Sequence, residues 1–216
     1  MNSCCNLSYD TEFDLKRARR ELKQYNRSGA KKSSQPMITK LRSLDLQNKT
    51  LLDIGGGIGS IIFELLKEGL QKTTYVDISY GYTQTFREEV EQQKINNQIK
   101  IYQGDFLDLH NEVPPAHLVT LDKVICCYED YQELVKYSLN KSQRWYAFII
   151  PRDTWWVKAV HGLELLGRKL IRNSFRTWIH PEKEIRELIV NQGFKEIFKV
   201  HRREWLILIY ERSEAI

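Results

Sequence analysis

Apolar and polar positions alternate along the middle of the chain in two different rhythms. Short apolar runs typical of buried strands recur between residues 50 and 151, and segments with apolar residues three or four apart lie between them. Strands separated by helices of this length indicate βαβ units with right-handed crossovers and a parallel sheet covered on both faces. The expected strands are 50–55, 73–79, 99–106, 117–124 and 144–151, and the expected helices between them are 59–70, 82–95 and 131–140.

The N-terminal part departs from this alternation. Apolar residues at helical spacing predict an amphipathic helix over residues 12–25, with basic residues covering its other face. A loop that contains glycine, serines and a proline follows, and then a short helix over 38–46. We therefore expect residues 1–48 to form an N-terminal helical cap and residues 49–216 to form the main domain.

The C-terminal part departs from it as well. A helix over 154–173 stands where the simple alternation would have none, and we interpret about 153–174 as an inserted capping segment. One face of this helix carries Trp156, Val160, Leu163 and Leu170. A last helix over 182–193 leads into two apolar runs, 194–203 and 204–212, which are joined so tightly that they predict an antiparallel hairpin.

Composition narrows the class of protein. The chain has 216 residues, enough for one well-packed domain, with 42% hydrophobic and 28% charged residues, which is typical of a soluble globular protein. No apolar run reaches the about eighteen residues of a membrane span, and the first residues do not look like a signal peptide, so we expect a cytoplasmic protein. The net charge of +5 comes from scattered basic clusters interleaved with acids, which argues against a nucleic-acid partner.

The four cysteines form two adjacent pairs, Cys4 with Cys5 and Cys126 with Cys127. Neighbours in sequence rarely form a disulfide without strain, so reduced thiols are expected. Cys126 and Cys127 are interpreted as small apolar residues near a strand end. An alternative is a thiol pair for a soft acceptor or a metalloid, which the N-terminal pair could join, but no metal site is expected.

A glycine-rich stretch, residues 51–60, follows the first expected strand. It lacks the lysine of a phosphate-binding loop. A dinucleotide turn has glycines at its first, third and sixth positions, and counting from Gly55 puts Ser60 sixth, which weakens that interpretation without excluding it. A third interpretation starts from the spacing of the stretch, in which an acid is followed by a glycine at every second position: Asp53, Gly55, Gly57 and Gly59.

This pattern resembles motif I of the class I S-adenosylmethionine-dependent methyltransferases. Further acids stand where that family would place them, with Asp77 ending the second strand, Asp105 after the third and Asp122 in the fourth-strand segment. The resemblance extends over about residues 50–209. It implies an α/β, Rossmann-like class I methyltransferase fold, with a mainly parallel seven-stranded sheet, an antiparallel last strand, helices on both faces and an extra capping helix. The implied cofactor is S-adenosyl-L-methionine, with S-adenosyl-L-homocysteine as product.

The side chains suit a nucleoside that carries an amino acid. The glycines leave room for the cofactor against the backbone. Asp77 can accept both ribose hydroxyls, Asp105 can meet the adenine amino group, and Asp53 can hold the amino end of the methionine. Alternatives are that Asp77 caps a helix and that Asp105 only ends a strand. The expected cofactor-binding residues are Arg27, Asp53, Gly55, Gly57, Gly59, Asp77, Ile78, Asp105, Phe106 and Asp122.

Methyl transfer from a sulfonium needs little covalent help, because alignment and exclusion of water supply most of the acceleration. The expected catalytic residues are therefore few. Tyr128 follows the fourth strand and is a candidate contact for the acceptor or the methyl group, with packing beneath the next helix as the alternative. His180 is a candidate general base, because its imidazole is neutral near pH 7, and the alternative is a helix-entry residue.

The acceptor itself is not readable from these motifs. A narrower, more distant resemblance is to magnesium-protoporphyrin O-methyltransferases, carried by the segments 121–130, 149–156 and 175–181. We favour a small-molecule acceptor, methylated on oxygen, and a monomer or homodimer. The alternatives are an RNA or protein methyltransferase, a non-catalytic module that binds S-adenosylmethionine, and an oxidoreductase that binds NAD.

Overall fold

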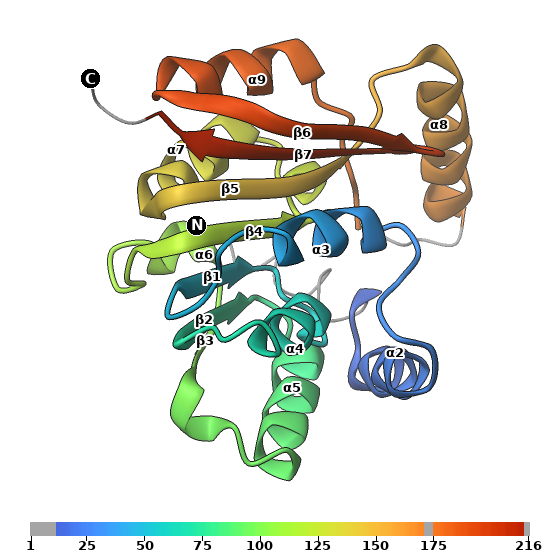
Figure 1. The fold of residues 1–216 in the computed structure, drawn as a ribbon. Coiled ribbons are helices and arrows are strands. Elements are labelled where there is room, and N and C mark those ends of the chain that lie inside the picture. Colours follow the sequence, from blue (N-terminus) through green and yellow to red (C-terminus); the bar gives the residue numbers. More distant parts are fainter. Residues whose placement is uncertain (1–11, 171–174, 214–216) are drawn as a thin grey trace.

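A computed structural model of the protein describes residues 12–170 and 175–213, and these form one seven-stranded sheet with helices on both faces (Figure 1). The strand order is β3-β2-β1-β4-β5-β7-β6. Strand β7 runs antiparallel to both β5 and β6, and the pairings among the first five strands are parallel. The strands are β1 Thr50–Ile54, β2 Lys72–Asp77, β3 Ile99–Gln103, β4 Ala116–Asp122, β5 Ser142–Pro151, β6 Phe194–Arg202 and β7 Trp205–Arg212. The expected fold class and its antiparallel last strand are confirmed.

In the described ranges, helices α2 and α3 precede β1, helices α8 and α9 lie between β5 and β6, and the other helices lie between the parallel strands. The α-helices are α2 Leu15–Ser28, α3 Gln35–Arg42, α4 Ser60–Leu66, α5 Tyr80–Gln92, α6 Phe106–Leu109, α7 Tyr131–Lys141, α8 Trp155–Leu170 and α9 Glu182–Asn191. Two short 3₁₀ turns are η1 Asn96–Gln98 and η2 Ile125–Cys127. In Figure 1, α2 and α8 lie beyond the carboxyl ends of the parallel strands. None of the helices in the described ranges is long and apolar enough to cross a membrane.

Strand β5 shows why the sheet is covered on both faces. Its residues alternate between two hydrophobic cores, with Trp145 and Ala147 in one and Tyr146 and Phe148 in the other. Successive side chains of a strand point to opposite faces, so a continuous apolar run is stable only where both faces are buried. One core is closed by α7 and α9, and the other by α3, α4 and α5.

Helix boundaries follow the capping residues more closely than the apolar pattern. Helix α2 begins later than expected because Asp14 caps it and accepts a hydrogen bond from Arg17 N at 2.7 Å. The expected third strand ends early because Asp105 caps the unexpected helix α6. Three buried side chains of α3 pack into the sheet core, so this helix does more than cap the domain.

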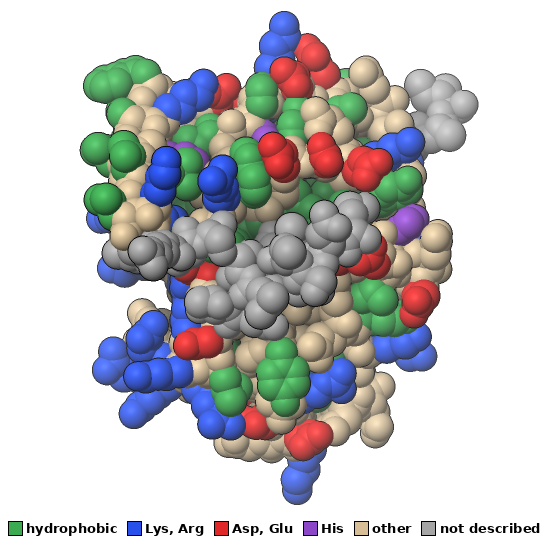
Figure 2. All heavy atoms as spheres, turned by 180° about the vertical axis from the view of Figure 1, so that it is seen from behind, with side chains coloured by type: hydrophobic (Ala, Val, Ile, Leu, Met, Phe, Trp, Pro, Cys, Tyr) green, Lys and Arg blue, Asp and Glu red, His purple; other side chains and the backbone are tan. Residues whose placement is uncertain are grey.

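Helix α8 differs most from its expected packing. Its buried residue is Val157, whereas Val160, Leu163 and Leu170 are 58%, 71% and 82% exposed. Figure 2 shows these apolar side chains gathered along one edge of the molecule. The helical periodicity was sufficient to locate the helix, but the apolar face it defines is turned to solvent instead of to the core.

Helix α2 is held against α5 by a close approach at Gly81. A Cβ atom at this position would lie 2.4 Å from the backbone nitrogen of Leu15. Ser79 Oγ also donates a hydrogen bond to Phe13 O at 2.7 Å, beside the same contact. Because the atoms in the way belong to the backbone, the clash cannot be relieved by a side-chain rotation.

We expect Gly81→Ala to lower the free energy of unfolding by about 1–3 kcal/mol, since overpacking forces backbone shifts. The matched control is Gly162→Ala in α8, where a Cβ meets nothing within 4 Å and the change should stabilise by up to about 1 kcal/mol. Urea unfolding followed by circular dichroism measures both. Equal stabilities of the two variants would contradict the close approach of α2 and α5.

Candidate active site

A cavity of about 530 Å³ lies at the carboxyl ends of the parallel strands, where the strand order reverses between β1 and β4. This is the position at which open α/β sheets bind their ligands. Helix α2 and the loop after it form one wall, and the ends of β1, β2 and β4 form the floor. Lining residues include Arg17, Glu21, Tyr25, Lys31, Ser34, Asp53, Gly55, Gly57, Asp77, Ile78, Tyr82, Phe106, Asp122, Lys123, Val124, Cys126, Cys127, Tyr128, Phe175 and Trp205.

The glycine turn after β1 is fixed by conformation and by packing. Gly55 and Gly59 have φ of 64° and 78°, in the left-handed region that side chains with a Cβ rarely adopt. A Cβ at Gly55 would lie 2.4 Å from Val124 Cγ2, and one at Gly59 would lie 2.1 Å from Phe86 Cε2. Gly55 and Gly57 line the cavity with their backbone uncovered, whereas Gly59 is packed against Phe86 and is not among the lining residues.

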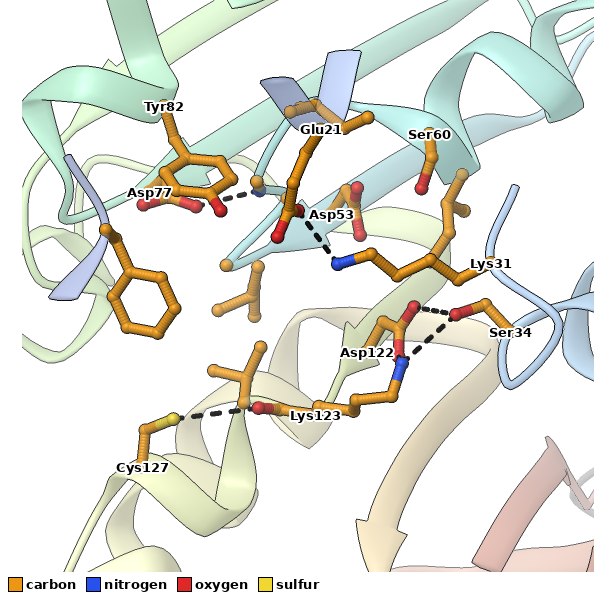
Figure 3. Close-up of a pocket in the computed structure, with 18 of the residues that line it drawn as sticks. Glu21, Lys31, Ser34, Asp53, Ser60, Asp77, Tyr82, Asp122, Lys123 and Cys127 are labelled. Atoms are coloured by element: carbon orange, nitrogen blue, oxygen red, sulfur yellow. Dashed lines mark hydrogen bonds and ion pairs between the residues drawn. The ribbon is translucent and has the colours of Figure 1, made fainter. Parts of the chain in front are cut away.

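Asp77 at the end of β2 holds this turn in place. Its carboxylate accepts hydrogen bonds from Gly57 N and Ser79 N, both at 2.8 Å, and it lines the cavity (Figure 3). Burial raises the pKa of Asp77 to about 6, and the two backbone N–H groups oppose that rise. The carboxylate thus joins the glycine turn to the β2 end.

Asp53 at the end of β1 is buried and only half satisfied. Its Oδ1 accepts a hydrogen bond from Thr120 Oγ1 at 2.6 Å, while its buried Oδ2 has no partner among the described residues. Burial raises the pKa of Asp53 to about 7, and the nearby Asp122 and Asp77 charges add to the rise. A buried carboxylate oxygen left unpaired at a cavity wall fits a donor from a ligand, such as an ammonium group. Together with the uncovered glycine turn, it makes the site fit S-adenosylmethionine.

Asp105 and Tyr128 lie together on the β3 side of the site. Tyr128 Oη donates to Asp105 Oδ1 at 2.7 Å, and Leu107 N donates to the same oxygen at 2.9 Å. The residues on either side of Asp105, Gly104 and Phe106, line the cavity, whereas Asp105 itself is not among the lining residues. In this structure its carboxylate therefore caps α6 and accepts the hydrogen bond from Tyr128.

Asp122, Lys123 and Ser34 form a cluster at the end of β4 (Figure 3). Lys123 Nζ donates to Asp122 Oδ1 at 2.9 Å and to Ser34 Oγ at 3.2 Å, and Ser34 Oγ donates to Asp122 Oδ2. The Lys123 ammonium also lies 5.2 Å from the centroid of the Trp205 ring. Both oxygens of Asp122 thus have partners from within the chain.

Sequence reasoning did not find several residues of this site. Lys123 and Ser34 carry no motif, and Ser34 meets Asp122 from 88 positions away in the chain. Thr120 could have been found, since it lies two residues before Asp122 in the same strand and so on the same face. Helix α2 contributes Arg17 instead of the expected Arg27, which is exposed and not among the lining residues.

His180 lies behind the cavity wall. It is not among the cavity-lining residues, and its Nε2 donates to Tyr128 O at 2.8 Å while its ring packs on Tyr131 at 4.2 Å. Burial lowers the pKa of His180, and its bonds to the backbone carbonyls of Tyr128 and Ile125 oppose the shift. The imidazole is thus tied to the segment that carries Tyr128.

The two cysteines after β4 line the cavity side by side. Cys126 Sγ and Cys127 Sγ both approach Lys123 O, at 3.4 Å and 3.6 Å. The hydrogen bond from Cys126, followed by burial, raises the pKa of Cys127 well above its usual value. The Cys127 thiol is therefore kept protonated and weakly nucleophilic. The other pair, Cys4 and Cys5, lies outside the described residues.

The chain is similar to known methyltransferases in sequence pattern and in fold. Residues 51–140 match the family model of a methyltransferase domain. No curated relative matches the chain. Magnesium protoporphyrin IX methyltransferase from Synechocystis PCC 6803, solved with bound SAH, superposes with a TM-score of 0.68 at 19% identity, covering 84% of this chain and 84% of that chain.

Two further structures share the fold. An O-methyltransferase family protein from Burkholderia thailandensis has a TM-score of 0.72 at 17% identity, covering 96% of this chain and 64% of that chain. A putative methyltransferase from Haloferax volcanii, in complex with the Trm112 methyltransferase activator, has a TM-score of 0.69 at 12% identity and covers 97% of each chain. Residues 51–140 thus match a methyltransferase domain, the described chain has the class I methyltransferase fold, and its glycine turn and buried acids fit S-adenosylmethionine.

Proposed function

We propose that the protein transfers the methyl group of S-adenosylmethionine to an oxygen atom of a small molecule. The observation that carries this proposal is the cavity itself. Its volume of about 530 Å³ lies in the range of small-molecule sites, and aromatic residues such as Phe13, Phe175 and Trp205 contribute to its walls. Such a cavity suits a compact, largely apolar acceptor that has to be aligned and kept from water.

The cofactor supplies an activated methyl group on a sulfonium. We assign its ribose hydroxyls to Asp77, whose carboxylate already lies at the glycine turn. We assign its amino group to Asp53, because Oδ2 of that residue is buried without a partner. Ile78 and Phe106 line the cavity near the β2 and β3 ends and would enclose the adenine, next to Asp105.

Tyr128 and His180 are positioning residues in this proposal. Tyr128 Oη is bonded to Asp105, so it orients the carboxylate at the adenine end. His180 holds the backbone of Tyr128 from outside the cavity. Neither side chain has to accept a proton for these roles. The acceptor's proton then leaves to solvent or to a group of the acceptor site.

Two segments would close the site over its ligands. Helix α2 contributes Arg17, Glu21 and Tyr25 to the cavity wall, within the N-terminal cap over residues 1–48. No residue of α8 in the inserted segment over about 153–174 is among the lining residues. Phe175, which follows that segment, does line the cavity. Phe13 and Phe175 meet edge to face at 5.2 Å, which joins the two segments above the cavity.

The direct test is methyl transfer itself, measured as release of S-adenosylhomocysteine with phenols, carboxylates, amines and thiols as acceptors. We expect turnover with an oxygen acceptor in the wild type. Asp77→Asn should weaken S-adenosylhomocysteine binding about tenfold or more, because charge-assisted hydrogen bonds are lost.

The matched control is Asp108→Asn, an exposed aspartate of α6, which should bind and turn over as the wild type does. Isothermal titration calorimetry measures both affinities. Normal cofactor binding by Asp77→Asn would place the ribose elsewhere. Cofactor binding without turnover on any acceptor class would favour a non-catalytic module.

Cofactor affinity should depend on pH through Asp53. Since burial raises its pKa to about 7, the side chain is largely protonated at pH 6 and no longer attracts an ammonium group. Affinity for S-adenosylhomocysteine should therefore fall about tenfold between about pH 8 and pH 6, and Asp53→Asn should bind weakly with a flatter profile. A flat wild-type profile would contradict the assignment of Asp53 to the amino group.

An RNA acceptor is the second candidate, favoured by the basic surface of α2. Lys16, Arg19, Arg20, Lys23 and Arg27 are exposed on the helix that also forms a cavity wall. Figure 2 shows basic side chains gathered beside the apolar edge of α8. A basic surface of this kind near an active site is a feature of nucleic-acid binding.

We expect a labelled RNA of about 20 nucleotides to bind at physiological salt no tighter than the non-specific range of about 10⁻⁴ to 10⁻⁶ M. Arg20→Glu combined with Lys23→Glu should leave turnover of a small acceptor unchanged, since both side chains are exposed and outside the cavity lining. Fluorescence anisotropy measures the RNA affinity. Tight binding that this double variant abolishes would favour the RNA acceptor.

A further inference from the structure

Lys123 has an unusual backbone conformation at the cavity wall. Its φ of 63° lies in the left-handed region, which residues with a long side chain rarely adopt. It follows directly after β4 and lines the cavity. Strained residues persist where the surrounding structure holds them, and they cluster at ligand-binding sites. The conformation therefore points to a role for the Lys123 side chain in the cavity.

The ammonium group of Lys123 is held in one place but is not saturated. An ammonium has three N–H groups, and here Asp122 Oδ1 at 2.9 Å and Ser34 Oγ at 3.2 Å accept two of them. Ser34 Oγ in turn donates to Asp122 Oδ2, so the three side chains form a closed ring of contacts (Figure 3). Among the described residues these are its two hydrogen-bond acceptors, which leaves one N–H group for a ligand.

The position of this ammonium separates it from the ribose and glycine side of the cavity. It lies 5.2 Å from the ring centroid of Trp205, which begins β7. In the sheet, β4 and β5 lie between β1 and β7. Asp77 ends β2, which is the neighbour of β1 on its opposite side. Lys123 therefore lies on the β4 and β7 side of the cavity, away from Asp77.

Two further lysines come to the cavity wall on the loop that carries Ser34. Ser34 N donates to Lys31 O at 2.9 Å, so the loop that brings Ser34 also brings Lys31 and Lys32 to the cavity wall. Lys31 is paired with Glu21 at 2.8 Å, and Lys32 adds a further positive charge. An anion that enters next to Trp205 would thus meet a preoriented donor in Lys123 and, on the neighbouring loop, the unpaired charge of Lys32 among the described residues.

We propose that Lys123 binds the carboxylate of an acidic acceptor, whose flat apolar body lies against Trp205. This inference rests on the proposed function and names its substrate class, a small aromatic acid. Asp122 and Ser34 act as positioning residues that hold the ammonium toward the acceptor. The rigid pairing avoids much of the entropy that a free lysine side chain loses on binding.

The test compares an acid with its neutral amide. With S-adenosylhomocysteine bound, 4-hydroxybenzoate and 4-hydroxybenzamide are titrated into the wild type by calorimetry. We expect the acid to bind about tenfold or more tightly than the amide, as a charge-assisted hydrogen bond predicts. Lys123→Gln should reduce this ratio to about one, because it removes the charge and leaves a polar side chain that is one atom shorter.

Two further variants keep the result interpretable. Lys123→Gly fits the φ of 63° without strain, so it should melt no lower than the wild type and still lose the preference for the acid. Lys183→Gln removes an equal charge from a side chain that is 87% exposed on α9, and it should keep the preference.

The other possible results separate the inference about Lys123 from the proposed function. If the wild type binds S-adenosylhomocysteine but shows no preference for the acid, or if Lys123→Gln keeps it, the inference is wrong and the proposed function stands. Loss of S-adenosylhomocysteine binding in Lys123→Gln would instead assign Lys123 to the cofactor and overturn the inference. A wild type that binds no S-adenosylhomocysteine would refute the proposed function itself.

Discussion

Two carboxylates buried at the ends of neighbouring strands are the constraint on which the site depends. Burial disfavours their charge and raises the pKa of Asp53 to about 7 and that of Asp77 to about 6. The chain offsets this cost with Gly57 N and Ser79 N at Asp77 and with Thr120 at Asp53. It leaves one oxygen of Asp53 without a partner, and a bound cofactor is the donor that would complete it.

The sheet topology places these groups where a ligand can reach them. Strand order reverses between β1 and β4, so the crossovers from these strands leave on opposite faces and a crevice opens at their carboxyl ends. The glycine turn after β1 is packed so closely against Val124 and Phe86 that its backbone has little freedom. The cofactor half of the cavity is therefore largely formed in advance, as a site that works by alignment needs.

The side of the cavity that we propose for the acceptor is assembled differently, from parts that lie far apart in the chain. Ser34 comes from the loop before α3, Asp122 and Lys123 from the end of β4, and Trp205 from the start of β7. Solved structures of similar fold include a magnesium protoporphyrin IX methyltransferase and a putative RNA methyltransferase from Pyrococcus horikoshii. A shared cofactor half with a variable acceptor half agrees with that breadth, because function lies in sites built on folds.

Local patterns were sufficient to predict most of the fold, the glycine turn and the acids at the ends of β1 and β2. Strand β5 alternates between two cores, so its continuous apolar run could be identified as a buried strand. The acid and glycines from Asp53 to Gly59, and Asp77 at the next strand end, depend only on spacing along the chain. The sequence by itself thus determined the sheet, the glycine turn and the positions of the buried acids.

Tertiary structure alone decided what surrounds those acids. The exposure of Leu163 and Leu170 on α8 depends on whether another element covers that face, which the helical period does not encode. The contact between Ser34 and Asp122 spans 88 positions, and it exists only because the loop after α2 returns to the end of β4. Such contacts depend on how distant elements pack, so no local pattern could have shown Lys123 held between them.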